Sequence, residues 1–137
     1  MDARVRSAIG ARLGASIVGL RALAGGSINE AWAVELGDGR SVFVKANASA
    51  PADMFDAEVH GLAFLREGLL GVEGISVPDV IACEREYLVL GLLEPAPARK
   101  DFDELLGRGL VSLHHSGARL QLGQSGRASF TCGTLPM

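Results

Sequence analysis

GGSINEAWAVELGDGRSVFVKA, residues 25–46, is the stretch of sequence that decides the fold. Apolar residues alternate with other residues in both of its halves, as expected for two half-buried strands. The residues of one face are Trp32, Val34 and Leu36 in the first strand and Val42, Val44 and Ala46 in the second. Phe43 and Lys45 fall on the other face. The glycines of residues 37–39 supply the positive φ angles that a short hairpin needs.

A glycine turn precedes this hairpin. Gly25 and Gly26 have no Cβ atoms, so their backbone can approach a ligand closely. Lys45 is one of only two lysines among 13 basic residues, and it lies between two apolar residues of its strand. A compact ammonium group acts as a point charge for phosphate oxygens. A glycine turn above a hairpin with an inward lysine therefore indicates phosphate handling. The alternative is that Lys45 is an ordinary strand residue on a wet face.

Composition and charge limit the other function classes. The formal net charge of −3 over 137 residues favours neither nucleic acid nor an anionic membrane surface as a partner. The sequence has no apolar run of membrane-spanning length and no signal-peptide pattern. Cys83 and Cys132 are too few and too far apart for a metal site or a disulfide framework. We therefore expect a reduced, cytoplasmic protein.

The remaining elements follow from periodicity and from helix start and stop signals. Helices are predicted at residues 3–13, 53–70 and 101–115, and further strands at residues 17–23, 77–83 and 87–90. Residues 94–98 contain two prolines and form a semi-rigid connector. Residues 116–137 have little periodicity, and no regular structure is assigned to them. The fold class is α+β, with a five-stranded antiparallel sheet and one helix packed on it.

Glu58 has an unusual position in the helix predicted at residues 53–70. It lies three residues after Phe55 and four before Leu62, so it belongs to the apolar stripe. A carboxylate in such a place needs a partner, because an unpaired buried charge is costly. Lys45, on the preceding strand, is the predicted partner. The alternative is that Glu58 lies at the edge of the stripe and reaches water.

This order of elements is that of the small lobe of the protein-kinase-like fold, and the sequence resembles one family with that fold. The segments that carry the resemblance are GGSINEAWAVELGDG, VFVKANA, MFDAEVHGLAFLRE, VPDVIAC, YLVL and LGRGLVSLHH. They resemble the fructosamine kinases, or ketosamine-3-kinases, which are related to the aminoglycoside and choline phosphotransferases. The resemblance covers most of residues 15–115. It implies ATP, with Mg²⁺, as cofactor and the phosphorylation of the sugar of glycated amines or proteins.

The resemblance also implies a role for particular residues. The phosphate-covering turn of the family falls on Gly25, Gly26, Ser27, Ile28 and Asn29. The lysine that contacts the α- and β-phosphates falls on Lys45, and the glutamate that orients it falls on Glu58. The hinge that binds adenine through its backbone falls on Gly91, Leu92 and Leu93. Gly91 departs from the acidic residue that the family usually has there.

The match degrades towards the end of the sequence. No Asp or Glu follows Glu104, whereas the family places its acceptor-orienting carboxylate and its Mg²⁺ ligands in a large lobe, in a His-Gly-Asp-Leu-Trp type loop and a later Asp. The resemblance therefore divides the chain into a nucleotide-binding lobe, residues 1–93, and residues 94–137, which hold the hinge connector, the first large-lobe helix and an irregular tail. We expect a truncated chain without catalytic or metal-binding residues, which is inactive alone. Whether it is an enzyme stays open.

Two alternative functions are a related small-molecule phosphotransferase and a non-catalytic remnant or interaction module. The acceptor substrate stays open, because specificity resides in the large lobe of the family. The helix predicted at residues 101–115 should expose an apolar face, and we expect self-association through it. That face consists of Phe102, Leu105, Leu106, Leu110 and Leu113.

Overall fold

The structure is a computed structural model that describes residues 1–24, 28–97 and 99–123, and the side chains as far as residue 116. Its elements are α1 (Ala3–Leu13), β1 (Ile17–Ala22), β2 (Glu30–Leu36), β3 (Ser41–Ala46), α2 (Met54–Gly68), β4 (Val80–Glu84), β5 (Tyr87–Gly91) and α3 (Phe102–Gly123). The chain forms two compact units. The first comprises Met1–His60 and Pro78–Pro95, and the second comprises Gly61–Val77 and Ala96–Met137.

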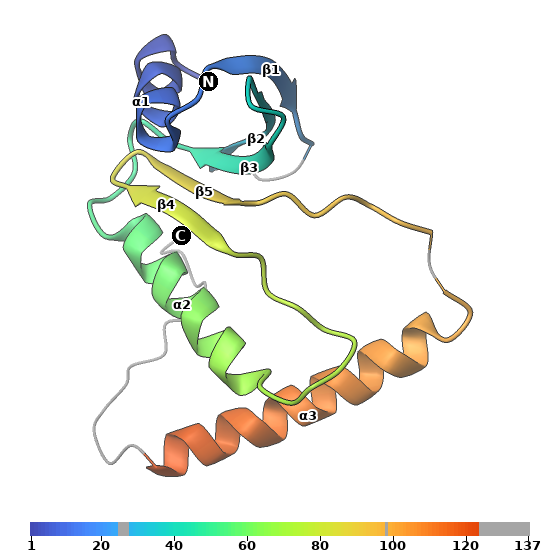
Figure 1. Cartoon of the computed structure of the whole chain (residues 1–137). Coiled ribbons are helices and arrows are strands. Elements are labelled where there is room, and N and C mark those ends of the chain that lie inside the picture. Colours follow the sequence, from blue (N-terminus) through green and yellow to red (C-terminus); the bar gives the residue numbers. More distant parts are fainter. Residues whose placement is uncertain (25–27, 98, 124–137) are drawn as a thin grey trace. The chain divides into compact units, whose positions relative to one another are not determined.

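The first unit is built on a five-stranded antiparallel sheet with the strand order β1-β2-β3-β5-β4 (Figure 1). The β2–β3 hairpin pairs Val34 with Val42, and β3 also pairs with β5, so β3 is the central strand. Gly39 takes a positive φ of 89° in the turn, which is why a glycine is needed there. The predicted five-stranded antiparallel sheet is confirmed.

One face of this sheet is covered by α1, which lies beside β1, β2 and β3 in Figure 1. Asp2 caps the helix by accepting hydrogen bonds from the backbone of its first turn, and Gly14 ends it with a φ of 66°. Val5 and Ile9 are the buried residues of α1. They pack in one cluster with the sheet residues Val34, Leu36, Val42, Val44, Ala46, Ala82, Tyr87 and Val89.

The first turns of α2 belong to the same unit and contact the opposite face of the sheet. Phe55 is only 1% exposed, and Glu58 and Asp56 form the polar contacts described below. The helix begins one residue later and ends two residues earlier than predicted. This face therefore buries apolar residues and also carries polar groups.

The second unit contains α3. The packed side of this helix consists of residues spaced four positions apart. Leu105, Gly109 and Leu113 lie along it and face the segment at residues 68–75. A Cβ atom at Gly109 would lie 2.5 Å from Cδ1 of Ile75, so this close approach favours glycine. The prediction for residues 116–137 is wrong in part, because α3 continues to Gly123. Residues 118–122 are Ala, Arg, Leu, Gln and Leu. These residue types have high helix propensity, so the helix continues here although no periodic pattern of apolar residues predicts it.

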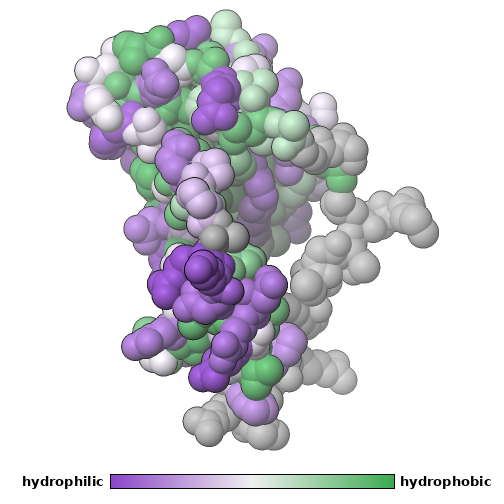
Figure 2. Space-filling model, turned by 90° about the vertical axis from the view of Figure 1, so that its right-hand side faces the viewer, coloured by the Kyte–Doolittle hydropathy of each residue, from purple (hydrophilic) through white to green (hydrophobic). Residues whose placement is uncertain are grey.

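Beside this packed side, α3 also presents apolar side chains to solvent. Phe102 is 48% exposed, Leu106 38%, Leu110 42% and Val111 55%. Leu105 and Leu113 are half-buried, so three of the five residues predicted to be exposed are exposed. Val111 is a further exposed apolar residue of this helix. On the face drawn in Figure 2, hydrophobic residues appear among hydrophilic ones. No helix in the described part of the chain is long and apolar enough to cross a membrane.

Candidate functional site

The centre of the candidate site is an ion pair between β3 and α2. Nζ of Lys45 donates a hydrogen bond to Oε1 of Glu58 at 2.5 Å. The predicted pair is therefore present. The side chains are 31% and 28% exposed, respectively, so Glu58 lies at the edge of the apolar stripe and reaches water while remaining paired. Both sequence interpretations of Glu58 are thus partly correct.

The strand register explains why Lys45 is held at this position. Lys45 pairs with Ala31 of β2 on one side and with Leu88 of β5 on the other. Leu88 is fully buried, and the aliphatic stem of a lysine can lie along apolar surface while its charged end reaches water. The backbone of Lys45 is thus fixed in the central strand, and its ammonium group is fixed by Glu58.

A second polar contact, which the sequence did not predict, lies on the same face. Sγ of Cys83 donates to Oδ1 of Asp56 at 3.6 Å. Burial, and then the hydrogen bond and charge of Asp56, raise the pKa of Cys83 to about 11. The thiol therefore stays protonated at neutral pH and is a poor nucleophile. The two residues are 27 positions apart, so no local sequence pattern could have linked them.

The predicted phosphate-covering turn is described only in part. Gly25, Gly26 and Ser27 lie outside the described residues. Ile28 and Asn29 precede β2, and the side chain of Asn47 contacts both of them. Nδ2 of Asn47 donates to the Ile28 carbonyl at 3.2 Å and to Oδ1 of Asn29 at 3.1 Å. Sequence reasoning missed Asn47, although a polar residue two positions after Lys45 at a strand end was an available signal.

The predicted hinge begins where β5 ends. Gly91 pairs with Val42 of β3 and donates its amide to the carbonyl of Asp79 at 2.8 Å. Leu92 is half-buried, and the side chain of Leu93 is 64% exposed. The residues predicted to form the hinge thus lie at the end of β5, the strand that pairs with the one carrying Lys45.

A metal site needs several ligand side chains close together. Among residues 1–24, 28–97 and 99–123, no three His, Cys, Asp or Glu residues are grouped in a way that could hold a metal ion. The ligands that Mg²⁺ prefers are carboxylate and other oxygen groups.

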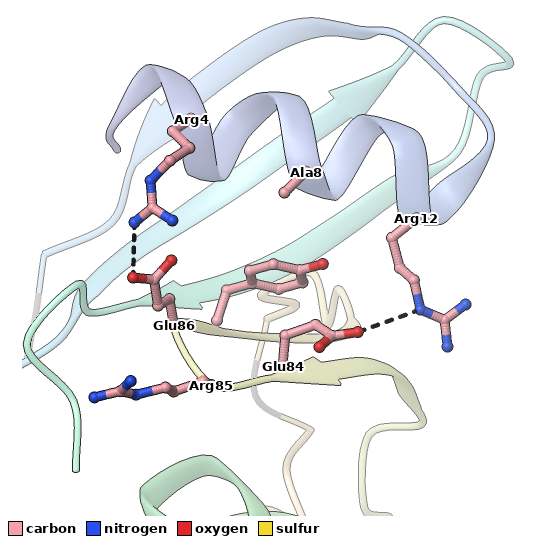
Figure 3. Close-up of a pocket in the computed structure, with 7 residues that line it drawn as sticks. Arg4, Ala8, Arg12, Glu84, Arg85 and Glu86 are labelled. Carbon is pink, nitrogen blue, oxygen red and sulfur yellow. Dashed lines mark hydrogen bonds and ion pairs between the residues drawn. The ribbon is translucent and has the colours of Figure 1, made fainter. Parts of the chain in front are cut away.

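An open pocket of about 610 Å³ lies away from Lys45, between α1 and the β4–β5 turn (Figure 3). Arg4 pairs with Glu86 at 2.7 Å, and Arg12 pairs with Glu84 at 3.7 Å. Burial, and then the charge of Glu84, raise the pKa of Tyr87 at this pocket. Its hydroxyl is therefore protonated at neutral pH. Two of the arginines at this pocket are thus paired with carboxylates of the β4–β5 hairpin.

Taken together, the antiparallel sheet, the central lysine and the helix glutamate define the small lobe of a protein-kinase-like fold. The model of the fructosamine kinase family matches residues 1–136. The chain belongs to the fructosamine kinase family.

Solved structures agree with this fold. Two proteins named "putative fructosamine-3-kinase" match, one from Thermobifida fusca with 25% identity and a TM-score of 0.63, and one from Haemophilus somnus with 24% identity and a TM-score of 0.62. Each comparison covers 80% of this chain and 38% of the other protein. A macrolide 2'-phosphotransferase type I matches with 21% identity and a TM-score of 0.51, over 71% of this chain and 33% of that protein. No curated protein matches the chain.

Proposed function

We propose that this chain is the ATP-binding part of a fructosamine kinase, whose complete form phosphorylates the sugar of a glycated amine or protein. The observation that carries the proposal is the partly exposed ion pair of Lys45, on the central strand, with Glu58 of α2. In this proposal Lys45 contacts the α- and β-phosphates, and Glu58 holds its ammonium group in place. A cytoplasmic location fits this role, because ATP is available there.

The rest of the nucleotide is assigned to main-chain groups. Adenine binds the backbone of Leu92 and Leu93, and residues 25–29 cover the phosphates. Gly91 has no acidic side chain, but its amide is bonded to Asp79. Adenine is held through the backbone in this proposal. The glycine at position 91 should therefore make the hinge more flexible but remove no contact with adenine.

We propose further that the chain alone does not transfer phosphate. Mg²⁺ supplies charge neutralisation in this reaction, and a carboxylate positions the acceptor hydroxyl. No Asp or Glu follows Glu104 in this sequence. Catalysis of phosphoryl transfer is mostly positioning and charge stabilisation. A chain that carries only half of the required groups should therefore lose nearly all of the catalytic activity.

The proposal is tested by measuring ATP binding with saturation-transfer NMR or calorimetry. The parent chain should bind ATP weakly, and Lys45→Ala should bind it about 10- to 100-fold more weakly, because a charged hydrogen bond is lost. Lys100→Ala is the matched control, since it removes the other lysine of the chain. It should bind like the parent. Equal ATP binding by the parent and Lys45→Ala would overturn the proposal.

Phosphate transfer is tested separately with ATP, Mg²⁺ and a small glycated amine. The parent should give no turnover above that of Lys45→Ala, which controls for contaminating kinase. Turnover by the parent that disappears in the variant would show that a carboxylate-free C-terminus can serve, and the second part of the proposal would be wrong. The likeness to a macrolide phosphotransferase concerns the fold alone and favours no second acceptor.

Self-association is also part of the proposal. The apolar residues exposed on α3 are Phe102, Leu106, Leu110 and Val111. Exposed apolar side chains gathered on one helix favour contact with a second copy of the chain. Leu106→Glu should reduce association in analytical ultracentrifugation. Ser112→Glu, at an exposed polar position of the same helix, is the control for added charge and should not. A parent chain that stays monomeric at high concentration would contradict this expectation.

A further inference from the structure

Asn47 lies two residues after Lys45, just beyond the point where main-chain pairing of β2 with β3 ends. The last pair of that ladder is Glu30 with Ala46. The next residues on the two strands are therefore Asn29 and Asn47, which face each other across the strand ends. A side-chain bond at this place can extend the ladder by one step where the backbone no longer does.

The side-chain amide of Asn47 is fully engaged. Its Nδ2 donates to the Ile28 carbonyl at 3.2 Å and to Oδ1 of Asn29 at 3.1 Å. Its Oδ1 accepts from the backbone amide of Ser49 at 2.9 Å. The orientation of the amide is fixed by these partners, because the Ile28 carbonyl can only accept and the Ser49 amide can only donate.

The main chain of Asn47 is tied on the opposite side. Its amide donates to the carbonyl of Glu86 at 2.9 Å, in the turn before β5. Its carbonyl accepts from the amide of Ala50 at 3.2 Å. Asn47 thus joins the residues preceding β2 to the turn before β5, from a position directly after the strand that carries Lys45.

We infer that Asn47 is a positioning residue of the nucleotide site, which sets the main chain of Ile28 and Asn29 at a fixed place relative to Lys45. This inference rests on the proposed function, since it assumes that these residues and Lys45 act on the same phosphates. Preorganised groups bind a ligand better because less freedom is lost on binding. Asn47 supplies that preorganisation through two donors on one amide.

The decisive variant is Asn47→Asp. It keeps the size of the side chain and the acceptor for Ser49, but it replaces the two donors with a carboxylate that faces two oxygens. ATP affinity should fall about 5- to 50-fold, as expected for two lost hydrogen bonds, whereas the affinity for adenosine should not change. Ser49→Asp places the same charge two residues away at an exposed position and controls for simple repulsion of ATP.

Hydrogen exchange gives a readout that does not need nucleotide. In Asn47→Asp, amides at residues 28–31 should exchange faster, while those of the β4–β5 hairpin should keep the parent rate. Asn47→Ala should show the same effects in weaker form, since it removes the donors without adding a charge.

The outcomes separate the two proposals. If Lys45→Ala weakens ATP binding but Asn47→Asp binds ATP no worse than Ser49→Asp does, the inference about Asn47 is wrong and the proposed function stands. If neither variant weakens ATP binding, or the parent binds no ATP, both are overturned. Equal losses for ATP and adenosine, with general loosening of the sheet in hydrogen exchange, would make Asn47 merely structural and would also overturn the inference.

Discussion

The two faces of the sheet differ in how they treat polar groups. On the α1 face, Val34, Val44 and Val89 are 0% exposed, and their cluster with α1 is apolar. The α2 face also buries apolar residues, among them Phe55 and Leu88, but it carries the Lys45–Glu58 pair at its partly exposed edge. The first face is thus an apolar packing face, and the second is the face to which we assign ligand binding in the proposed function.

The largest expected effect comes from a charge placed at a buried residue of β3. Val44→Asp places an unpaired carboxylate in the α1 face, and it should cost about 3–5 kcal/mol of unfolding free energy. Such a loss is a large fraction of the stability of a small unit. Urea unfolding followed by circular dichroism measures it. Ser41→Asp makes the same change at an exposed position of the same strand and should change stability by less than about 0.5 kcal/mol. A folded Val44→Asp with parental stability would refute the role given to the α1 face.

A smaller effect is expected at the start of α1. Oδ1 of Asp2 accepts from the amides of Arg4 at 2.7 Å and Val5 at 3.4 Å. Asp2→Ala removes this cap and should cost about 1 kcal/mol. Asp2→Asn keeps an acceptor at the same place and should lose much less. Thermal unfolding of the two variants measures the difference. Equal stability of both would mean that the α1 face does not depend on the capped helix.

The two faces were not equally predictable from the sequence. The hairpin and the Lys45–Glu58 pair could be predicted because alternation and helical spacing are local, and only 13 positions separate the two residues. The α1 helix could also be predicted, but not the face that it covers, because a helix pattern does not name its partner. The contacts of Asn47 with residues 28–29 and of Cys83 with Asp56 depend on strand register and helix placement. The extension of α3 to Gly123 depends on propensity rather than on periodicity.

On the α2 face, removal of the lysine should hardly affect folding. Lys45→Met keeps the apolar stem and removes the charge, and partly exposed ion pairs are worth about 0–1 kcal/mol. The change in unfolding free energy should therefore stay below about 1 kcal/mol, even though the proposed ATP binding should weaken. A double-mutant cycle with Glu58→Gln measures the coupling between the two side chains. A coupling of several kcal/mol would mean that the pair is structural, and the contrast between the faces would disappear.

The smallest expected effect on stability, and the sharpest test of the chemistry of the α2 face, concerns Cys83. Its pKa is raised to about 11, first by burial and then by Asp56. At pH 8 its thiolate fraction should be roughly a hundredfold below that of an unperturbed cysteine, and alkylation should be slower to the same degree. Because the unfolded chain releases this proton at lower pH than the folded one, the contribution of Cys83 to stability should be lost as pH rises from about 8.5 towards 11.

The measurement is the alkylation rate against pH in a Cys132→Ser background, which leaves one thiol in the chain. The rate should keep rising to about pH 11. Asp56→Asn removes the charge and weakens the hydrogen bond, but it should move the profile only part of the way to that of a free cysteine, because burial is the larger cause. A profile that levels off near pH 8.5 in the folded parent would mean that the thiol is solvated. The α2 face would then be more open than the contacts of Cys83 and Asp56 indicate.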